Sequence, residues 1–199
     1  MCIKKIKGVL LNPSVFFKNL SREKGLGSAF GYFALLSAVA AILSFVLLSL
    51  FPSFYSTTFQ KLLGIDLPQS PVLTFWIMLV LTILSYALNL ALSFLWAAIL
   101  HIWIMIFGGE GKYHESYKLY IYAITPKVLL SWIPVIFFIG WIWEIVLLII
   151  GTQKVYGLSK TKSVLIYVIP AVVLVILMIA FYVFVGYVLK NSLPVPTVS

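Results

Sequence analysis

One uninterrupted apolar stretch decides the fold: residues 72–109, which read VLTFWIMLVLTILSYALNLALSFLWAAILHIWIMIFGG. None of these residues is Asp, Glu, Lys or Arg. At 1.5 Å per residue, roughly 36 helical residues measure about 54 Å, which exceeds the ~30 Å hydrocarbon core of a bilayer. We therefore expect a tilted membrane-spanning helix over residues 72–107, with a stub that projects past the interface.

Three further intervals without charged residues extend this pattern: 25–60, 128–143 and 163–189. Of the 199 residues, 63% are hydrophobic and 10% are charged, a composition far from that of a soluble domain. The apolar runs are apolar on every face, whereas the strands of a transmembrane barrel alternate in polarity. The sequence thus predicts an all-α, polytopic membrane protein.

Residues 119–156 leave the number of spans open, because they could form two short spans joined near Phe138 to Gly140 or one broken helix. The positive-inside rule favours two. In that case the N-terminal tail and the loops after spans two and four share one side, with eleven of the 14 Lys and Arg residues against two on the other. One span would reduce the split to nine against four. We expect a five-helix transmembrane bundle in the cell membrane, with spans over about 27–51, 72–107, 119–138, 140–156 and 163–189.

This topology places the N-terminus in the cytoplasm and residues 190–199 in an extracytoplasmic tail. Residues 1–26 mix basic and apolar side chains at helical spacing, and Asn12 followed by Pro13 is typical of a helix N-terminus. We expect a short amphipathic helix from Pro13 to about Ser21 that lies in the interface, with its apolar side among acyl chains and its lysines toward anionic lipid. The lysines and arginines on the cytoplasmic side of the membrane explain the net charge of +9. We therefore expect no nucleic-acid partner.

Small residues recur every three or four positions along span one, and they predict a face on which another helix packs closely. They are Gly27, Gly31, Ala34, Ala38 and Ala41. A homo-oligomer is compatible with such a face. Residues 52–71 then carry turn and breaker residues, so we expect the chain to leave the bilayer there.

Span two carries polar residues that would share one helical face. They are Thr82, Ser85, Asn89, Ser93 and His101. The stripe could face protein, or its hydroxyl groups could bond back to carbonyls of their own helix. Asn89 separates the two interpretations, since a buried amide needs a partner.

Two charged residues fall within the hydrocarbon region, Lys127 in span three and Glu144 in span four. Counted from a turn near Gly140, their backbones are offset by roughly 13 Å at 1.5 Å per residue. A direct ion pair is thus one alternative. The other is that Glu144 is hydrated at the outer interface beside Trp141 and Trp143, while Lys127 bonds carbonyls freed by prolines. A pair would be the polar centre of the bundle and a proton or ion site.

Glu110, His114 and Glu115 are the only cluster of residue types that could hold a divalent cation, with His101 nearby. The favoured interpretation is a solvated loop, and Gly108, Gly109 and Gly111 allow the chain to reverse there. No motif of a hydrolase, P-loop or dinucleotide site is present. We expect no enzymatic activity and no cofactor.

Several landmarks of the sequence resemble the Ypt/Rab-interacting-protein (Yip) domain family of five-helix membrane proteins. They are Asn12-Pro13 to Phe17, Gly108-Gly109-Glu110-Gly111-Lys112-Tyr113, Tyr120, Tyr122, Pro126, Ile133-Pro134, Trp143, Gly151 and Tyr156-Gly157-Leu158-Ser159. Eukaryotic members are associated with vesicle traffic and small GTPases and carry a longer cytosolic tail with an Asp-Leu-Tyr-Gly-Pro motif. This chain lacks that motif and is similar to the short prokaryotic members, so the resemblance implies the fold and weakens a small-GTPase partner.

Two functions from different classes follow from these observations. The first is a non-enzymatic membrane protein that organises the bilayer or partner proteins, as the resemblance implies. The alternative is a small transporter or channel for an ion or lipid, which would use the polar face of span two.

Overall fold

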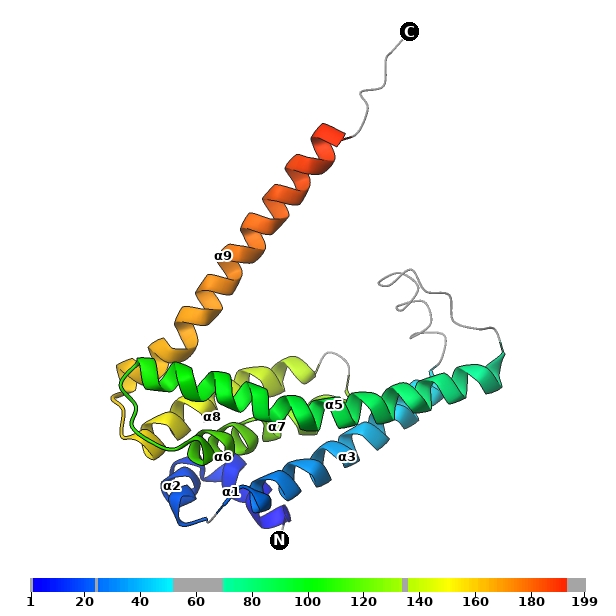
Figure 1. The fold of residues 1–199 in the computed structure, drawn as a ribbon. Helices are drawn as coiled ribbons and strands as arrows, with labels where there is room; N and C mark the ends of the chain where they lie inside the picture. Colours follow the sequence, from blue (N-terminus) through cyan, green and yellow to red (C-terminus); the bar gives the residue numbers. More distant parts are fainter. Residues whose placement is uncertain (1, 24, 52–69, 134–135, 193–199) are drawn as a thin grey trace.

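The computed structural model describes all residues except 1, 24, 52–69, 134–135 and 193–199. Secondary structure in the described part is entirely helical (Figure 1). The α-helices are α1 (Cys2–Leu11), α2 (Pro13–Lys18), α3 (Gly27–Leu50), α5 (Pro71–Ile106), α6 (Tyr113–Ala123), α7 (Thr125–Leu130), α8 (Phe137–Tyr156) and α9 (Lys160–Ser192), and a 3-10 turn, η1, covers Leu20–Arg22.

Four described helices are long and apolar enough to cross a membrane: Gly27–Leu50, Val72–Ile106, Phe137–Tyr156 and Lys160–Val185. The first two agree with the expected spans within one residue at each end. Helix α9 begins three residues earlier than expected and carries Pro170 in its interior. The turn signals expected over residues 52–71 fall almost wholly outside the described residues.

The segment expected to form a span over 119–138 is divided in the structure. Helix α6 starts already at Tyr113 and ends at Ala123, and α7 follows from Thr125. The cause is Pro126, which has no N–H for the carbonyl of Tyr122. The hydroxyl of Thr125 donates a hydrogen bond to that carbonyl at 2.7 Å and so satisfies it.

Helices α6 and α7 run antiparallel to α8, side by side with it. A Cβ atom added to Gly151 would overlap the side chain of Leu119, and one added to Gly140 would lie 2.8 Å from Cα of Lys127. Gly140 thus lies within α8 and against α7, so the turn expected near Phe138 to Gly140 was wrong. The link falls between Leu130 and Phe137 instead.

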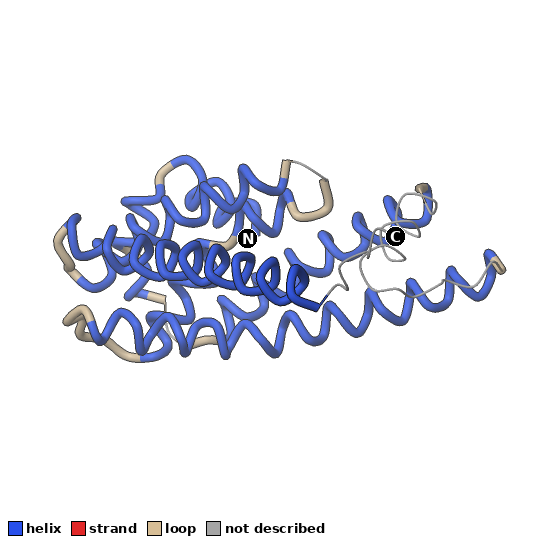
Figure 2. Tube along the Cα trace, turned by 90° about the horizontal axis from the view of Figure 1, so that it is seen from above, coloured by secondary structure: helices blue, strands red, loops and turns tan. Residues whose placement is uncertain are grey.

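The core lies at one end of the bundle, which we call the basic end. Here α2 packs on α8 and α1 on α7, and the links between α5 and α6 and between α8 and α9 lie at the same end (Figures 1 and 2). Its largest fully buried side chains include Phe17, Phe33, Tyr117 and Tyr122. Away from this end the helices diverge, and residues 171–184 of α9 are all exposed. Such apolar surface is what lipid covers in a membrane protein.

Candidate functional site

The N-terminal helices pack on the bundle through apolar side chains. Val9, Phe17 and Leu20 are buried, and the ring of Phe17 lies where a Cβ atom on Gly151 of α8 would approach within 3.2 Å. Phe16 packs edge-on against Tyr122 of α6, with ring centroids 5.0 Å apart. The expectation that the apolar side of this segment enters the acyl region therefore needs correction, because most of that side lies in the protein core.

Helix α2 begins at Pro13 with Asn12 at the N-cap position, as the sequence predicts, although the Asn12 side chain makes no capping hydrogen bond. The helix was expected to continue to about Ser21, but it ends earlier. The α-helix stops at Lys18, and the 3-10 turn Leu20–Arg22 continues the chain. Helix α1 precedes both, and the chain turns sharply between α1 and α2 so that the side chain of Phe16 contacts Gly8.

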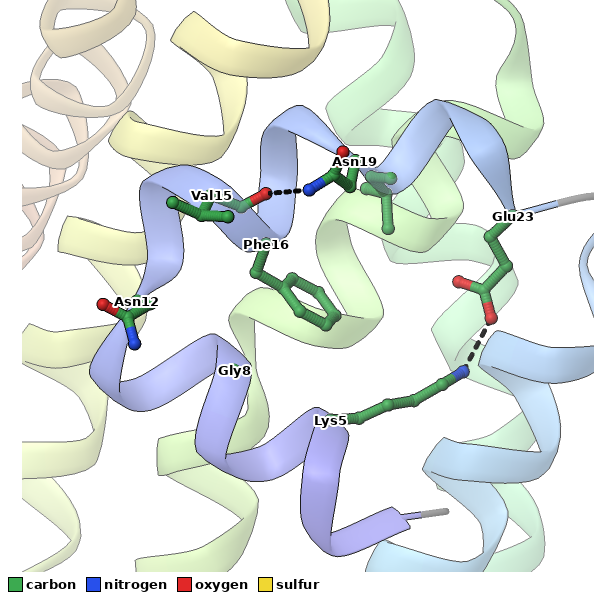
Figure 3. Close-up of a pocket in the computed structure, with 8 residues that line it drawn as sticks. Lys5, Gly8, Asn12, Val15, Phe16, Asn19 and Glu23 are labelled. Carbon is green, nitrogen blue, oxygen red and sulfur yellow. Dashed lines mark hydrogen bonds and ion pairs between the residues drawn. The ribbon is translucent and has the colours of Figure 1, made fainter.

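A polar cluster joins three distant parts of the chain at this position. Nζ of Lys5 lies 2.6 Å from a carboxylate oxygen of Glu23, and Figure 3 shows the two side chains reaching toward one another. Lys5 also donates to the hydroxyl groups of Ser28, at 2.7 Å, and Tyr122, at 2.6 Å. The hydroxyl of Tyr122 in turn donates to the carboxylate of Glu23 at 2.8 Å. We call Lys5, Glu23, Ser28 and Tyr122 the N-terminal clamp.

Hydrogen bonding sets the charge state of the clamp. Burial of the carboxyl group opposes ionisation, but hydrogen bonds from Lys5, Ser28 and Tyr122 outweigh it and hold the pKa of Glu23 below its usual 4.5. Lys118, which is 1% exposed, donates to the carbonyls of Leu20 at 3.2 Å and Glu23 at 2.7 Å.

A groove of about 310 Å³ lies between α1 and α2 (Figure 3). Its lining includes Lys5, Gly8, Asn12, Phe16 and Glu23. The outer surface of the two helices is both basic and apolar. We call this surface the N-terminal face and define it by the exposed residues Ile3, Lys4, Lys7, Leu11, Val15 and Lys18.

Lys127 and Glu144 are in direct contact in the structure. Nζ of Lys127 lies 3.1 Å from Oε2 of Glu144, with 35% and 12% of the two side chains exposed. Nζ also lies 5.5 Å from the ring centroid of Trp141, a distance at which a cation and an aromatic face attract. The expected axial offset does not arise, because the chain turns before α8 and Gly140 packs on the backbone of Lys127.

The polar stripe of α5 does not form one buried face. The hydroxyl groups of Thr82, Ser85 and Ser93 donate to carbonyls three or four residues earlier in α5, at 2.7 to 2.9 Å. Ser93 is also buried, and its hydroxyl lies 3.3 Å from that of Tyr117. Asn89 is exposed in the single chain, so its amide is not buried against another helix of this chain.

His101, the last residue of the stripe, belongs to a different cluster at the basic end. Its Nδ1 atom lies 2.8 Å from the hydroxyl of Ser116 on α6. Ser116 is also hydrogen-bonded to the hydroxyl of Tyr156 on α8. The three residues thus join α5, α6 and α8.

The residues considered for metal binding do not form a metal site. Among the described residues, no group of three or more His, Cys, Asp and Glu could hold a metal ion. Glu115 instead accepts a hydrogen bond from the backbone N–H of Lys112 at 3.0 Å, and its own N–H donates to the Lys112 carbonyl at 2.9 Å, at the start of α6. Glu110 is exposed, and His114 is partly buried. The glycine segment reverses the chain as expected, since Gly108 has a φ of +83°.

The small-residue stripe of α3 is only partly used for packing within the chain. Ala38 and Ala41 line a cavity of about 220 Å³ against α5, and the carbonyl of Ala34 accepts a hydrogen bond from Tyr86 at 3.2 Å. Gly27 and Gly31 are exposed, and a Cβ atom on either would contact no other group within 4 Å. The buried face of α3 is formed by neighbouring residues: Ala29, Tyr32, Phe33, Leu36, Ser37 and Ala40.

Sequence reasoning missed the N-terminal clamp and Lys118. Glu23 is the only acidic residue among the first 65, so its position within a basic segment was an available signal. Lys118 offered a second signal, because it lies among the aromatic residues of α6 and becomes fully buried there. Neither residue shows from sequence which partner it takes.

The arrangement of the helices agrees with a known family. Residues 7–182 match the Yip1 domain, which is most of the chain. The chain belongs to the Yip1 domain family. Comparison with curated proteins finds no match, and neither does comparison with solved structures. The Yip1 match includes α2, the clamp residue Glu23 and the Lys127–Glu144 pair, and its apolar helices make the protein an integral membrane protein.

Proposed function

We propose that this Yip1-domain protein is a non-enzymatic membrane protein that organises the bilayer by gathering anionic lipid at its N-terminal face. The observation that carries the proposal is the clamp. Lys5 and Glu23 fix α1 and α2 on the bundle, while Lys4, Lys7 and Lys18 stay exposed. Lysines near an anionic membrane surface each contribute about 1 kcal/mol of binding. The exposed Ile3, Leu11 and Val15 add apolar area for the headgroup boundary.

We infer a topology of five crossings with the N-terminus in the cytoplasm. The antiparallel packing of α6 and α7 on α8 supports it, because α8 must be entered from the end opposite to the basic end. Helices α6 and α7 together contain 17 residues, which measure about 26 Å at 1.5 Å per residue. The eleven Lys and Arg residues on the N-terminal side then face the cytoplasm, as the positive-inside rule requires.

The transporter alternative loses its first support, since the hydroxyl groups of the stripe are bonded within α5 and Asn89 is exposed. A second copy of the chain is compatible with the free glycines of α3 and with Asn89, but no described contact requires it. A small-GTPase partner has no observed support beyond family membership. Anionic lipid is therefore the partner that the exposed lysines favour.

The test is a comparison of lipid selectivity by electron spin resonance of spin-labelled lipids in proteoliposomes. Wild-type protein should prefer phosphatidylglycerol over phosphatidylcholine, and added salt should weaken this preference. The triple variant Lys4→Gln, Lys7→Gln, Lys18→Gln should lower the relative association constant at least about fivefold, the effect of about 1 kcal/mol from a single lysine.

The matched control removes three exposed lysines elsewhere at the basic end: Lys154→Gln, Lys160→Gln, Lys162→Gln. It should retain most of the preference, because these residues lie on α8 and α9 and not on the N-terminal face. Equal selectivity in the wild type and the first variant would contradict the proposal. So would an equal loss in both variants, which would indicate general attraction to net charge.

A further inference from the structure

A cavity with polar groups lies between α5, α8 and α9, where the helices begin to diverge. Its volume is about 800 Å³. Trp96, Trp103 and Leu100 of α5 form one wall, and Pro170 with its neighbours on α9 forms another. Trp96 and Trp141 at its edges are more than half exposed, so the cavity opens sideways. In a bilayer this opening meets acyl chains and not water.

The cavity is held open by a specific contact. Pro170 has no N–H, so the carbonyl of Ile166 lacks its usual partner within α9. Nε1 of Trp103 donates a hydrogen bond to that carbonyl at 2.6 Å. This bond joins α5 to α9 at the point of divergence. The bond fixes the start of α9 against α5 without a bound molecule, so this part of the cavity is preformed.

Four ionisable or hydroxyl-bearing side chains line this mainly apolar space, and the hydroxyl of one of them, Tyr167, is already hydrogen-bonded to Thr152 at 2.6 Å. Lys127 and Glu144 line it as an ion pair, and Tyr120 lines it from α6. The hydroxyl of Tyr120 has no hydrogen-bond partner among the residues that the structure describes. Lys127 keeps donors beyond the one directed at Glu144, and its side chain is 35% exposed. A ligand group here can both donate to a carboxylate and accept from an ammonium or phenol group.

The geometry limits the chemical class of the ligand. The walls are mainly aliphatic and aromatic, which suits a hydrocarbon chain and not a hydrated ion. Glu144 lies twelve residues from Tyr156 and seven from Phe137, about 18 Å and about 10 Å from the two ends of α8, so in a membrane-spanning α8 the polar centre lies within the hydrocarbon region. The charges of Lys127 and Glu144 already cancel. A charged headgroup would leave an uncompensated charge at this depth, which is costly.

We propose that the cavity between α5, α8 and α9 binds an uncharged, hydroxyl-bearing lipid, whose hydroxyl group contacts Lys127, Glu144 and Tyr120 and whose chain lies between α5 and α9. The diacylglycerols and long-chain alcohols belong to this class. The hydroxyl group donates to the carboxylate of Glu144 and accepts from Lys127 or Tyr120. The site is separate from the N-terminal face, so its occupancy does not depend on anionic lipid.

The experiment is photolabelling of the protein in phosphatidylcholine nanodiscs with a diacylglycerol that carries a diazirine in one acyl chain. Labelled residues are mapped by mass spectrometry. Labelling should saturate and should concentrate on residues 96–103 and 166–174. A tenfold excess of dioleoylglycerol should reduce it at least about fivefold, whereas equal oleic acid or added phosphatidylcholine should not, because a charged or bulky headgroup does not fit the neutral site.

Matched variants locate the site. Ile99→Trp fills the cavity from α5 and should remove the saturable labelling, as should Val173→Trp from α9. Ile102→Trp is the control, because Ile102 is exposed on α5 and does not line the cavity. Tyr120→Phe should weaken labelling severalfold, while Tyr182→Phe on the exposed part of α9 should leave it unchanged. Thermal unfolding of each variant establishes that it is folded.

Three results would overturn the proposal. The first is labelling that rises linearly with probe and spreads evenly over α3 and α9, which indicates acyl chains of the bulk bilayer only. The second is unchanged labelling when both Ile99→Trp and Val173→Trp are folded. The third is competition by oleic acid as strong as that by dioleoylglycerol, which would assign a charged ligand to the site.

Discussion

Lys127 on α7 and Glu144 on α8 form an ion pair, with Nζ 3.1 Å from Oε2. The pair exists because Gly140 lets the two helix backbones approach. Glu144 lies one turn after Gly140 in α8, and there its carboxylate is within reach of the Lys127 side chain. Charged groups at this depth are costly unless paired. The contact therefore couples the packing of α7 on α8 to the one charge pair in the described part of the bundle interior.

This coupling should be measurable in a double-mutant cycle. Lys127→Met should lower the free energy of unfolding by roughly 2–3 kcal/mol, because it leaves the carboxylate of Glu144 unpaired. Glu144→Gln should have a similar effect. The double variant should be nearly as stable as either single variant, with a coupling energy above ~1 kcal/mol in unfolding followed in detergent micelles. Strictly additive losses would rule out the contact.

Gly140 should be intolerant of even one added carbon. Gly140→Ala should destabilise the protein by about 1–3 kcal/mol, because its Cβ atom would meet the backbone of Lys127, which cannot rotate away. Gly31→Ala is the matched control in α3, where a Cβ atom meets nothing within 4 Å. It should be neutral or stabilising by up to about 1 kcal/mol through helix propensity. Equal midpoints of thermal unfolding for the two variants would contradict the observed packing.

The N-terminal clamp should weaken when the pH falls below about 4.5 and should not change between pH 4.5 and pH 7. The pKa of Glu23 is below 4.5 in the folded protein, so its contribution is fully present above pH 4.5 and is lost as the pH falls through the folded pKa. The anisotropy of a fluorophore on Leu11→Cys, in a Cys2→Ser background, should be constant from pH 7 to 4.5 and fall below it. Glu23→Gln should cost about 2 kcal/mol of docking free energy and lower the anisotropy already at pH 7. A wild-type transition centred above pH 4.5 would contradict this assignment.

Two members of the polar stripe on α5 should behave oppositely. Asn89→Leu should be neutral or stabilising, since Asn89 is exposed and a lipid-facing amide is unfavourable. Ser93→Leu should destabilise the protein by roughly 1–3 kcal/mol, because Ser93 is buried where α5 packs against Tyr117 of α6. Thermal stability in a single detergent compares them directly. A loss of stability or of oligomers in Asn89→Leu alone would show instead that the amide contacts a second copy.

The sequence predicted what depends on local signals and missed what depends on tertiary contacts. The bounds of α3 and α5 follow from uncharged runs, and Asn12-Pro13 marks the start of α2, so all three were predictable. The division of α6 from α7 at Pro126 was less so, because it requires Thr125 to satisfy the carbonyl of Tyr122.

The same distinction holds for the site. Lys127 and Glu144 were predictable as rare intramembrane charges, but their contact depended on where the chain turns before α8. The clamp joins Lys5 to Tyr122, which are 117 residues apart, and no periodicity or spacing encodes such a pairing. The exposure of Asn89 could not be predicted for a related reason. A helical face can be predicted from spacing, whereas its neighbour cannot.

The most direct test of the account is the depth of the N-terminal face in a bilayer. Val15→Cys in a Cys2→Ser background carries an environment-sensitive fluorophore at a position that is 62% exposed. In proteoliposomes containing phosphatidylglycerol, a nitroxide on the lipid headgroup should quench it strongly and a nitroxide deep in the acyl chain only weakly. The triple variant Lys4→Gln, Lys7→Gln, Lys18→Gln should lose most of the headgroup quenching. A fluorophore that stays in water, quenched by aqueous iodide and by neither lipid, would contradict the account.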